Sequence, residues 1–130
     1  MGDYQPVKRD SPFTLTASAT ITGGQLLTAS GAGTVAPSTT GDHSIGVAGF
    51  DTVSGQPVTI WPLSGANHEI VIQNTIVIAA GAPIIAGTAG TVNTGTLATV
   101  AAAGTLLGIC VTGGTGNAGG TVKARFVGIA

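Results

Sequence analysis

The sequence has 130 residues, which suggests one domain with a buried core, and 43% of them are hydrophobic. Only 7% are charged, against about 25% in ordinary soluble domains, and the net charge is −1. No basic field exists that would attract nucleic acid or an anionic membrane, and the apolar content argues against a disordered chain. A surface this poor in charge suits a free monomer badly, so we expect other subunits to cover much of it.

Residues 1–13 are predicted to form an extended arm ahead of the folded part. The residue before a proline avoids the helical region, and no apolar run typical of a signal peptide opens the chain. The arm carries two prolines and four of the nine charged residues of the chain, namely Pro6, Pro12, Asp3, Lys8, Arg9 and Asp10.

Short strands separated by Gly and Ser turns are expected over the rest of the first half. Alternating residues at 13–17 begin the folded part, and 26–35 reads as a strand followed by a Gly-rich turn. Strands at 45–48 and 58–63 flank a turn signal at Ser54-Gly55, as in a hairpin.

The second half repeats this pattern. Residues 68–78 give the strongest strand signal, interrupted at Gln73-Asn74, and further strands are expected at 84–86, 91–92, 107–110 and 122–126. Residues 94–103 are the only stretch that could be helical, and we expect a loop or at best one short helical turn. No apolar run reaches the about 18 residues of a membrane span.

Three elements recur in the same order. Residues 21–27 resemble 78–84 at an offset of 57, residues 45–48 resemble 107–110 at an offset of 62, and residues 58–62 resemble 122–126 at an offset of 64. Two copies are too few for a solenoid. The pattern predicts an all-β, compact β-barrel or sandwich-like (β-tulip-like) single domain over 14–130, with one pseudo-repeat at about 14–65 and the second at about 66–130.

Candidate catalytic features are weak. The segment Gly114–Gly119 matches the dinucleotide-binding pattern of spaced glycines, but a strand rather than a helix is expected next, so we interpret it as a loop. His43 and His68 have no third metal ligand nearby in sequence and are interpreted as surface or interface residues. Cys110 occupies the repeat position of Ala48 and is interpreted as a small buried residue; a single cysteine excludes an internal disulfide and fits synthesis in a reducing compartment. We therefore predict no enzyme activity, no cofactor and no metal site.

Trp61 is the most informative aromatic residue. Val58 and Ile60 alternate with Thr59 and Trp61, so Trp61 and Thr59 lie on the face opposite the two aliphatic residues. Tryptophan on an outer face is typical of protein interfaces, which makes Trp61 and Thr59 candidate subunit contacts. A tryptophan buried in the core of a two-layer fold is the alternative.

The order of short motifs resembles the small bacteriophage head decoration, or capsid cement, proteins. The motifs cover nearly the whole chain and are Leu15–Ala17, Gly23–Leu27, Ile45–Ala48, Ser54–Ile60, Leu107–Ile109 and Val122–Phe126. The resemblance implies a homotrimer that sits on the outside of an icosahedral head and binds neighbouring major capsid subunits, with no catalytic residues. Residues 88–104 depart from the pattern through their Gly, Thr and Ala content.

We therefore interpret the chain as a structural virion protein on the outer surface of a phage capsid, made in the host cytoplasm, which stabilises the capsid lattice. The alternative is a non-catalytic binding module, such as a carbohydrate-binding or tail-fibre-type β domain. The arm is the candidate capsid-docking element, in which Tyr4 and Val7 fill pockets while Lys8 and Arg9 pair with acidic groups. A leader without a role is the alternative for the arm.

Overall fold

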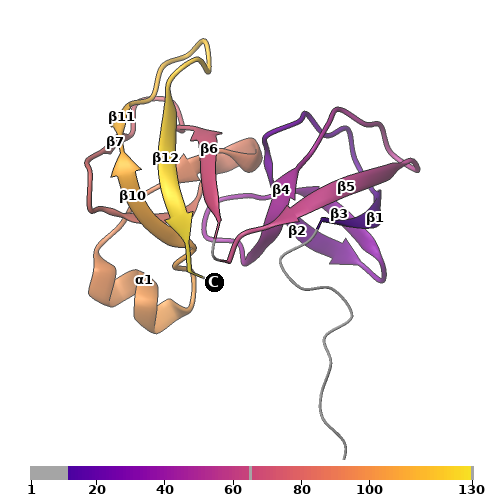
Figure 1. The fold of residues 1–130 in the computed structure, drawn as a ribbon, viewed down its shortest axis with the longest axis horizontal. Coiled ribbons are helices and arrows are strands. Elements are labelled where there is room, and N and C mark those ends of the chain that lie inside the picture. Colours follow the sequence, from indigo (N-terminus) through magenta and orange to yellow (C-terminus); the bar gives the residue numbers. More distant parts are fainter. Residues whose placement is uncertain (1–11, 65, 130) are drawn as a thin grey trace, which may run out of the picture.

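The computed structural model describes residues 12–64 and 66–129 as two β lobes joined near the middle of the chain (Figure 1). Strands make up 47% of the structure and helices 9%, so the prediction of an all-β fold is confirmed. Neither of the described helices is long and apolar enough to span a membrane. The elements are β1 (Phe13–Ala17), β2 (Leu26–Gly31), β3 (Thr34–Pro37), β4 (Ser44–Ala48), β5 (Pro57–Pro62), β6 (Asn67–Val71), β7 (Val77–Ile78), β8 (Pro83–Ala86), the 3-10 turn η1 (Thr88–Gly90), β9 (Val92–Asn93), α1 (Leu97–Ala103), β10 (Gly108–Thr112), β11 (Gly114–Thr115) and β12 (Lys123–Gly128).

The first lobe is a closed five-stranded barrel in the order β1-β3-β2-β4-β5. Neighbouring strands are antiparallel except for β1 and β3, whose parallel pairing (Thr16 with Thr34, Ala17 with Val35) is part of the closure. Successive residues of a strand face opposite sides, so alternate side chains fill the barrel. Its core consists of Ala17, Ile21, Leu27, Val35, Ala48, Val58 and Ile60.

The second lobe repeats the strand order of the first. Its sheet runs β6-β12-β10-β8-β9, and a parallel bridge between Ile72 and Val92 links the two ends where β1 and β3 pair in the first lobe. The bridge between Ile21 and Thr52 in the first lobe has its counterpart in the pairing of β7 with β11. The two lobes therefore share one pairing order of their strands.

Backbone details of the two lobes also correspond. Gly46 pairs with Leu27 and Pro62, and Gly108 pairs with Ile84 and Gly128, in the fourth strand of each lobe.

The strand register corrects one part of the predicted repeat. Ile60 lies opposite Ala48, and Phe126 lies opposite Cys110, so the offset at the last strand is 66 residues rather than 64. A shift of two residues preserves which side chains face inward, because the period of a strand is two. The prediction of the outer face of this strand was therefore unaffected by the error.

Two local predictions differ from the structure. Residues 26–37 form the hairpin β2-β3, whereas the sequence predicts one strand followed by a Gly-rich turn. The stretch expected to contain at most one helical turn holds the seven-residue helix α1. Four of its seven residues are alanine, the best helix former, and Gly104 ends it in the left-handed conformation (φ +71°) with its N–H donating to the carbonyls of Val100 and Ala101.

The second core reaches into the first lobe. Leu26 and Val47 are buried with residues of the second lobe, while their neighbours Leu27 and Ala48 face the first barrel. The outer side of β2 and β4 thus forms part of the contact between the lobes. The second cluster consists of Leu26, Val47, Leu63, Ile70, Ile72, Ile78, Ile84, Ala86, Val92, Leu107, Cys110, Ala124 and Phe126.

Candidate binding surface at the junction of the two lobes

Trp61 lies on the outer face of β5, as the alternation predicted. Val58 and Ile60 are fully buried, whereas Thr59 is half-buried and Trp61 is 49% exposed. The indole lies over Gly49, since a Cβ built at Gly49 would come within 3.1 Å of the indole Nε1. The core alternative for Trp61 is therefore wrong, and the side chain is available for contact with another molecule.

A cleft of about 390 Å³ opens beside Trp61, where β5 passes into β6. Both apolar and polar residues line it, which is typical of surfaces that bind a mixed apolar and polar partner. The described residues that line it are Val47, Trp61, Pro62, Ser64, Ala66, Asn67 and His68.

His68 has a structural environment in the wall of this cleft. Its Nε2 lies 3.0 Å from the carbonyl oxygen of Pro62, and its ring lies against that of Phe126 with centroids 5.7 Å apart. Desolvation by burial lowers the pKa of His68, and the carbonyls of Pro62 and Leu63 oppose this shift. A neutral imidazole that donates to the Pro62 carbonyl links β6 to the end of β5.

The three carboxylates among the described residues each have a structural partner. Asp42 accepts hydrogen bonds from the backbone N–H and the hydroxyl of Thr39, at 2.7 and 2.9 Å. Asp51 accepts from the N–H of Gly23 at 2.8 Å, and Glu69 pairs with Arg125 at 2.7 Å. Each of the three carboxylates therefore stabilises a loop or a strand pair through its own hydrogen bond or ion pair.

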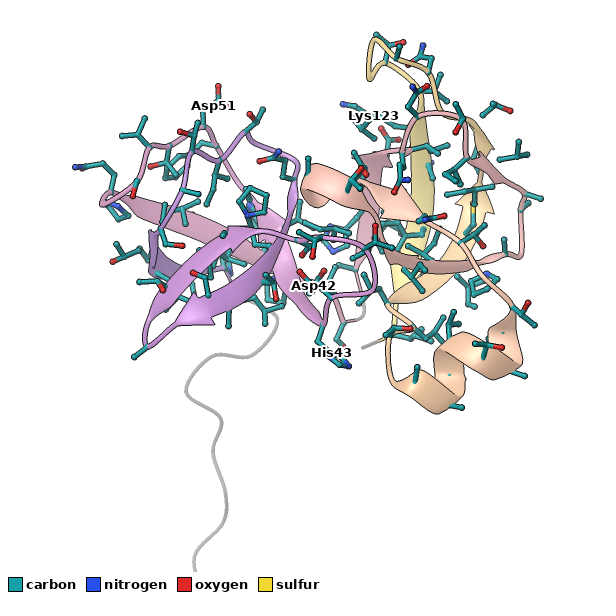
Figure 2. The ribbon with its side chains drawn as sticks, turned by 180° about the vertical axis from the view of Figure 1, so that it is seen from behind. Asp42, His43, Asp51 and Lys123 are labelled. Carbon is teal, nitrogen blue, oxygen red and sulfur yellow. The ribbon has the colours of Figure 1, made fainter. Side chains whose placement is uncertain are left out.

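The labelled charged residues in Figure 2 do not converge on one point. Asp51 lies at the top of the first lobe and Lys123 at the upper inner side of the second lobe, while Asp42 and His43 lie lower down, where the lobes meet. Among residues 12–64 and 66–129, no group of three or more His, Cys, Asp or Glu side chains is placed to hold a metal ion.

The remaining candidate features of the sequence are structural. Within the glycine-rich segment 114–119, Gly114 and Thr115 form β11 and a loop leads into β12, so no helix N-terminus follows. Gly116 lies against the chain at Gln73, whose carbonyl a Cβ would meet at 2.0 Å. Cys110 is buried, and burial raises the pKa of its thiol, as expected for a small core residue that replaces Ala48.

The alternation along β5 predicted the outward orientation of Trp61 but not the cleft beside it. The residues of the connection between the lobes, such as Ala66 and Asn67, carry no signal beyond that of a joint between repeats. Val47 sits on an apolar strand where the inward and outward residues are both aliphatic, so the alternation was hidden. The candidate docking residues Tyr4, Val7, Lys8 and Arg9 lie outside the described residues.

The described residues define a fold of two consecutive β lobes with the same strand order. A solved structure with this fold is the N-terminal base of the head fibre protein gp8.5 of bacteriophage phi29. It is 18% identical in sequence and superposes with a TM-score of 0.65 over 91% of this chain and 92% of that one. No protein-family model and no curated protein matches the sequence. The similarity therefore establishes the fold.

Proposed function

We propose that this chain is a structural protein of a bacteriophage virion that binds the outer surface of the head and stabilises its lattice. The observation that carries the proposal is the fold match to the base of a phage head fibre, which extends over 91% of the chain. The charge-poor sequence and the structural roles of the carboxylates support a binding protein rather than an enzyme. The partners in this proposal are the major capsid protein and further copies of the chain, which form a homotrimer.

Stabilisation would follow from mass action. A protein that binds the assembled lattice and not the free capsid subunits shifts the equilibrium towards assembly, by about 2.7 kcal/mol per site at a concentration of 100 times the dissociation constant. Several symmetric contacts made by one oligomer add avidity.

The arm and the Trp61 face are the proposed contacts. The arm combines charge with two prolines, a composition that suits an extended strand added to an exposed sheet edge. Trp61 and Thr59 form an outer face next to a cleft lined by apolar and polar residues, which suits burial against another protein.

Co-sedimentation with heads that lack this chain tests the proposal. The full chain is expected to sediment with the heads and to raise the temperature at which they release their DNA, and the variant without residues 2–11 is expected to fold but not to sediment. Full-chain protein that stays in the supernatant contradicts head binding. A truncated protein that binds with unchanged affinity contradicts only the role of the arm.

The exposed Trp61 beside the cleft also supports the alternative of a carbohydrate-binding module, because an aromatic face next to a small cleft can hold a sugar ring. A glycan array separates the two functions. Binding to a glycan that is lost in Trp61→Ala, together with absence of head binding, would favour the alternative.

A further inference from the structure

The two lobes can be compared position by position, because the register fixes which residues are equivalent. Leu26, Val47 and Trp61 are opposite one another on the outer side of β2, β4 and β5. Their equivalents on β8, β10 and β12 are Pro83, Ile109 and Val127. Leu63 directly follows β5 and Ile129 directly follows β12, so these two residues are also equivalent.

The outer face of the first lobe is covered by the second lobe. Leu26 is fully buried, Val47 is 7% exposed and Leu63 is 3% exposed, and all three belong to the core shared with the second lobe. Trp61 lies at the edge of this covered face. The contact buries apolar side chains that would otherwise face water, which is favourable.

The same face of the second lobe is open. Ile129, the equivalent of Leu63, is 54% exposed, and Val127 is 37% exposed. Pro83 and Ile109 are only half-buried. Helix α1 packs against β8 beside this face, but Val127 and Ile129 remain exposed, so no described part of the chain covers the face as fully as the second lobe covers the first.

Residues 86–90 form the edge of the second lobe that covers the first lobe. This edge is partly buried, whereas the equivalent edge of the first lobe is exposed. In the second lobe, Ala86 is fully buried and Gly90 is buried against the first lobe. At an offset of 57 residues their equivalents in the first lobe are Ala29 and Gly33, which are both exposed. Gly33 and Gly90 have nearly the same backbone angle, φ +73° and +72°, whereas Ala89 has a positive φ (+52°) and its equivalent Ala32 does not. The two edges therefore share the glycine conformation but differ at the preceding residue.

Three hydrogen bonds hold the covering edge in place within the chain. Gly41 N–H donates to the Ala86 carbonyl at 3.1 Å, Gly90 N–H donates to the Ser38 carbonyl at 2.8 Å, and the Gln25 side chain donates to the Ala89 carbonyl at 3.0 Å. The chain therefore contains one complete contact between an outer face and an edge. The outer face of the second lobe and the edge of the first lobe are each left without such a contact among the described residues.

We propose that the open face of the second lobe docks onto the free edge of the first lobe of another copy of this chain. The open face comprises Pro83, Ile109, Val127 and Ile129, and the free edge comprises residues 29–33. This inference deepens the self-association that is part of the proposed function, by naming the surfaces and their orientation. A contact between two different surfaces is head-to-tail, and it closes into a ring when the rotation between copies permits. A ring of three chains would then contain six lobes in alternation.

The proposed contact between copies cannot form every hydrogen bond that the contact between the two lobes of one chain forms. Ala82 stands where the first lobe has Gln25, so the side-chain hydrogen bond to the carbonyl of the partner edge is absent. Burial of the aliphatic face has to supply more of the affinity than it does between the lobes of one chain. The interface is thus weaker than the contact between lobes, and it can be measured by dilution.

Cross-linking between two singly substituted chains tests the orientation. Gln25 contacts Ala89 within the chain, so their equivalents Ala82 and Ala32 should meet between copies. Ala82→Cys and Ala32→Cys are each made in a Cys110→Ala background, which the alanine at the equivalent position 48 shows to be compatible with this core. We expect a short bismaleimide to join chains in the mixture but not in either variant alone, both for concentrated protein and for protein added to heads.

A charge substitution tests the apolar face. Ile129→Asp is expected to raise the dissociation constant of self-association at least about tenfold in sedimentation velocity, since the carboxylate would be buried without a partner. Val77→Asp is the matched control, because Val77 is 65% exposed on β7, away from this face, and it should leave association unchanged.

The outcomes separate this inference from the proposed function. Absence of the mixed cross-link both in solution and on heads, or equal cross-linking within the Ala82→Cys variant alone, overturns the head-to-tail contact. If Ile129→Asp associates like the unmodified chain, the open face is not the interface. A chain that cross-links as expected but does not sediment with heads refutes head binding and leaves the self-contact intact.

Discussion

Leu63 and Ile129 occupy equivalent positions at the ends of β5 and β12, yet they should differ sharply in their contribution to stability. Leu63 is 3% exposed in the core shared by the lobes, and Ile129 is 54% exposed. Truncation of either residue to alanine removes three carbon atoms, which for a buried side chain corresponds to about 2.4 kcal/mol of transfer free energy at about 0.8 kcal/mol each. The cavity left at position 63 adds to this cost, so Leu63→Ala should lower the free energy of unfolding by about 2.5–5 kcal/mol.

Urea unfolding followed by the fluorescence of Trp61, the sole tryptophan, measures both effects. With a denaturant dependence of about 2 kcal/mol per M, Leu63→Ala should move the midpoint by roughly 1–2.5 M, and Ile129→Ala should change stability by no more than about 0.5 kcal/mol. The protein is diluted until the midpoint no longer depends on its concentration, so that the separated chain is measured. Equal costs for the two variants would refute the assignment of one face as covered and the other as open.

Three further predictions follow from the strand contacts. Gly46→Ala and Gly108→Ala should each destabilise the fold by about 1–3 kcal/mol in urea unfolding. A Cβ at position 46 would lie 2.4 Å from the Ile60 side chain, and a Cβ at position 108 would lie 2.3 Å from the Val127 carbonyl oxygen. Gly119→Ala, whose Cβ would have its nearest contact at 3.9 Å, should be neutral or slightly stabilising. The pKa of His68, lowered by desolvation, should appear below 6.5 in an NMR titration, and a pKa above 6.5 would contradict the buried neutral ring. Because the unfolded chain then binds the proton more tightly than the folded chain, the free energy of unfolding should fall as the pH falls through about 6.5. Arg125→Ala should cost less than about 1 kcal/mol, because the pair with Glu69 is exposed, and a larger loss would show that the sheet depends on this pair.

The parts of the fold that follow from local chemistry could be predicted from the sequence. Strict alternation along β5 fixed which face carries Trp61, and glycine between aliphatic residues marked Gly46 and Gly108 as equivalent. The offset at the last strand could not be determined from the sequence. Val58-Thr59 resembles Val122-Lys123, at an offset of 64, as closely as it resembles the structural equivalents at an offset of 66. Only cross-strand register separates two alignments that differ by one period of a strand.

The features that depend on distant contacts could not be predicted. The parallel pairing of β1 with β3 brings together Thr16 and Thr34, and nothing local to either residue signals it. The cleft beside Trp61 exists because the two lobes meet there, and its residues are ordinary in sequence. Helix α1 was underestimated because Gly and Thr around it suggested a loop, whereas its alanines and the left-handed Gly104 outweigh them.

Electron cryo-microscopy of virions of the phage that encodes this chain tests head binding most directly. The two-lobed density of the chain is expected on the outer surface of the head, arranged around symmetric sites of the capsid lattice, and it should be missing from heads of a mutant phage that lacks the gene. Density for the chain on the tail, or its absence from heads that nevertheless contain every other structural protein, would contradict the proposal.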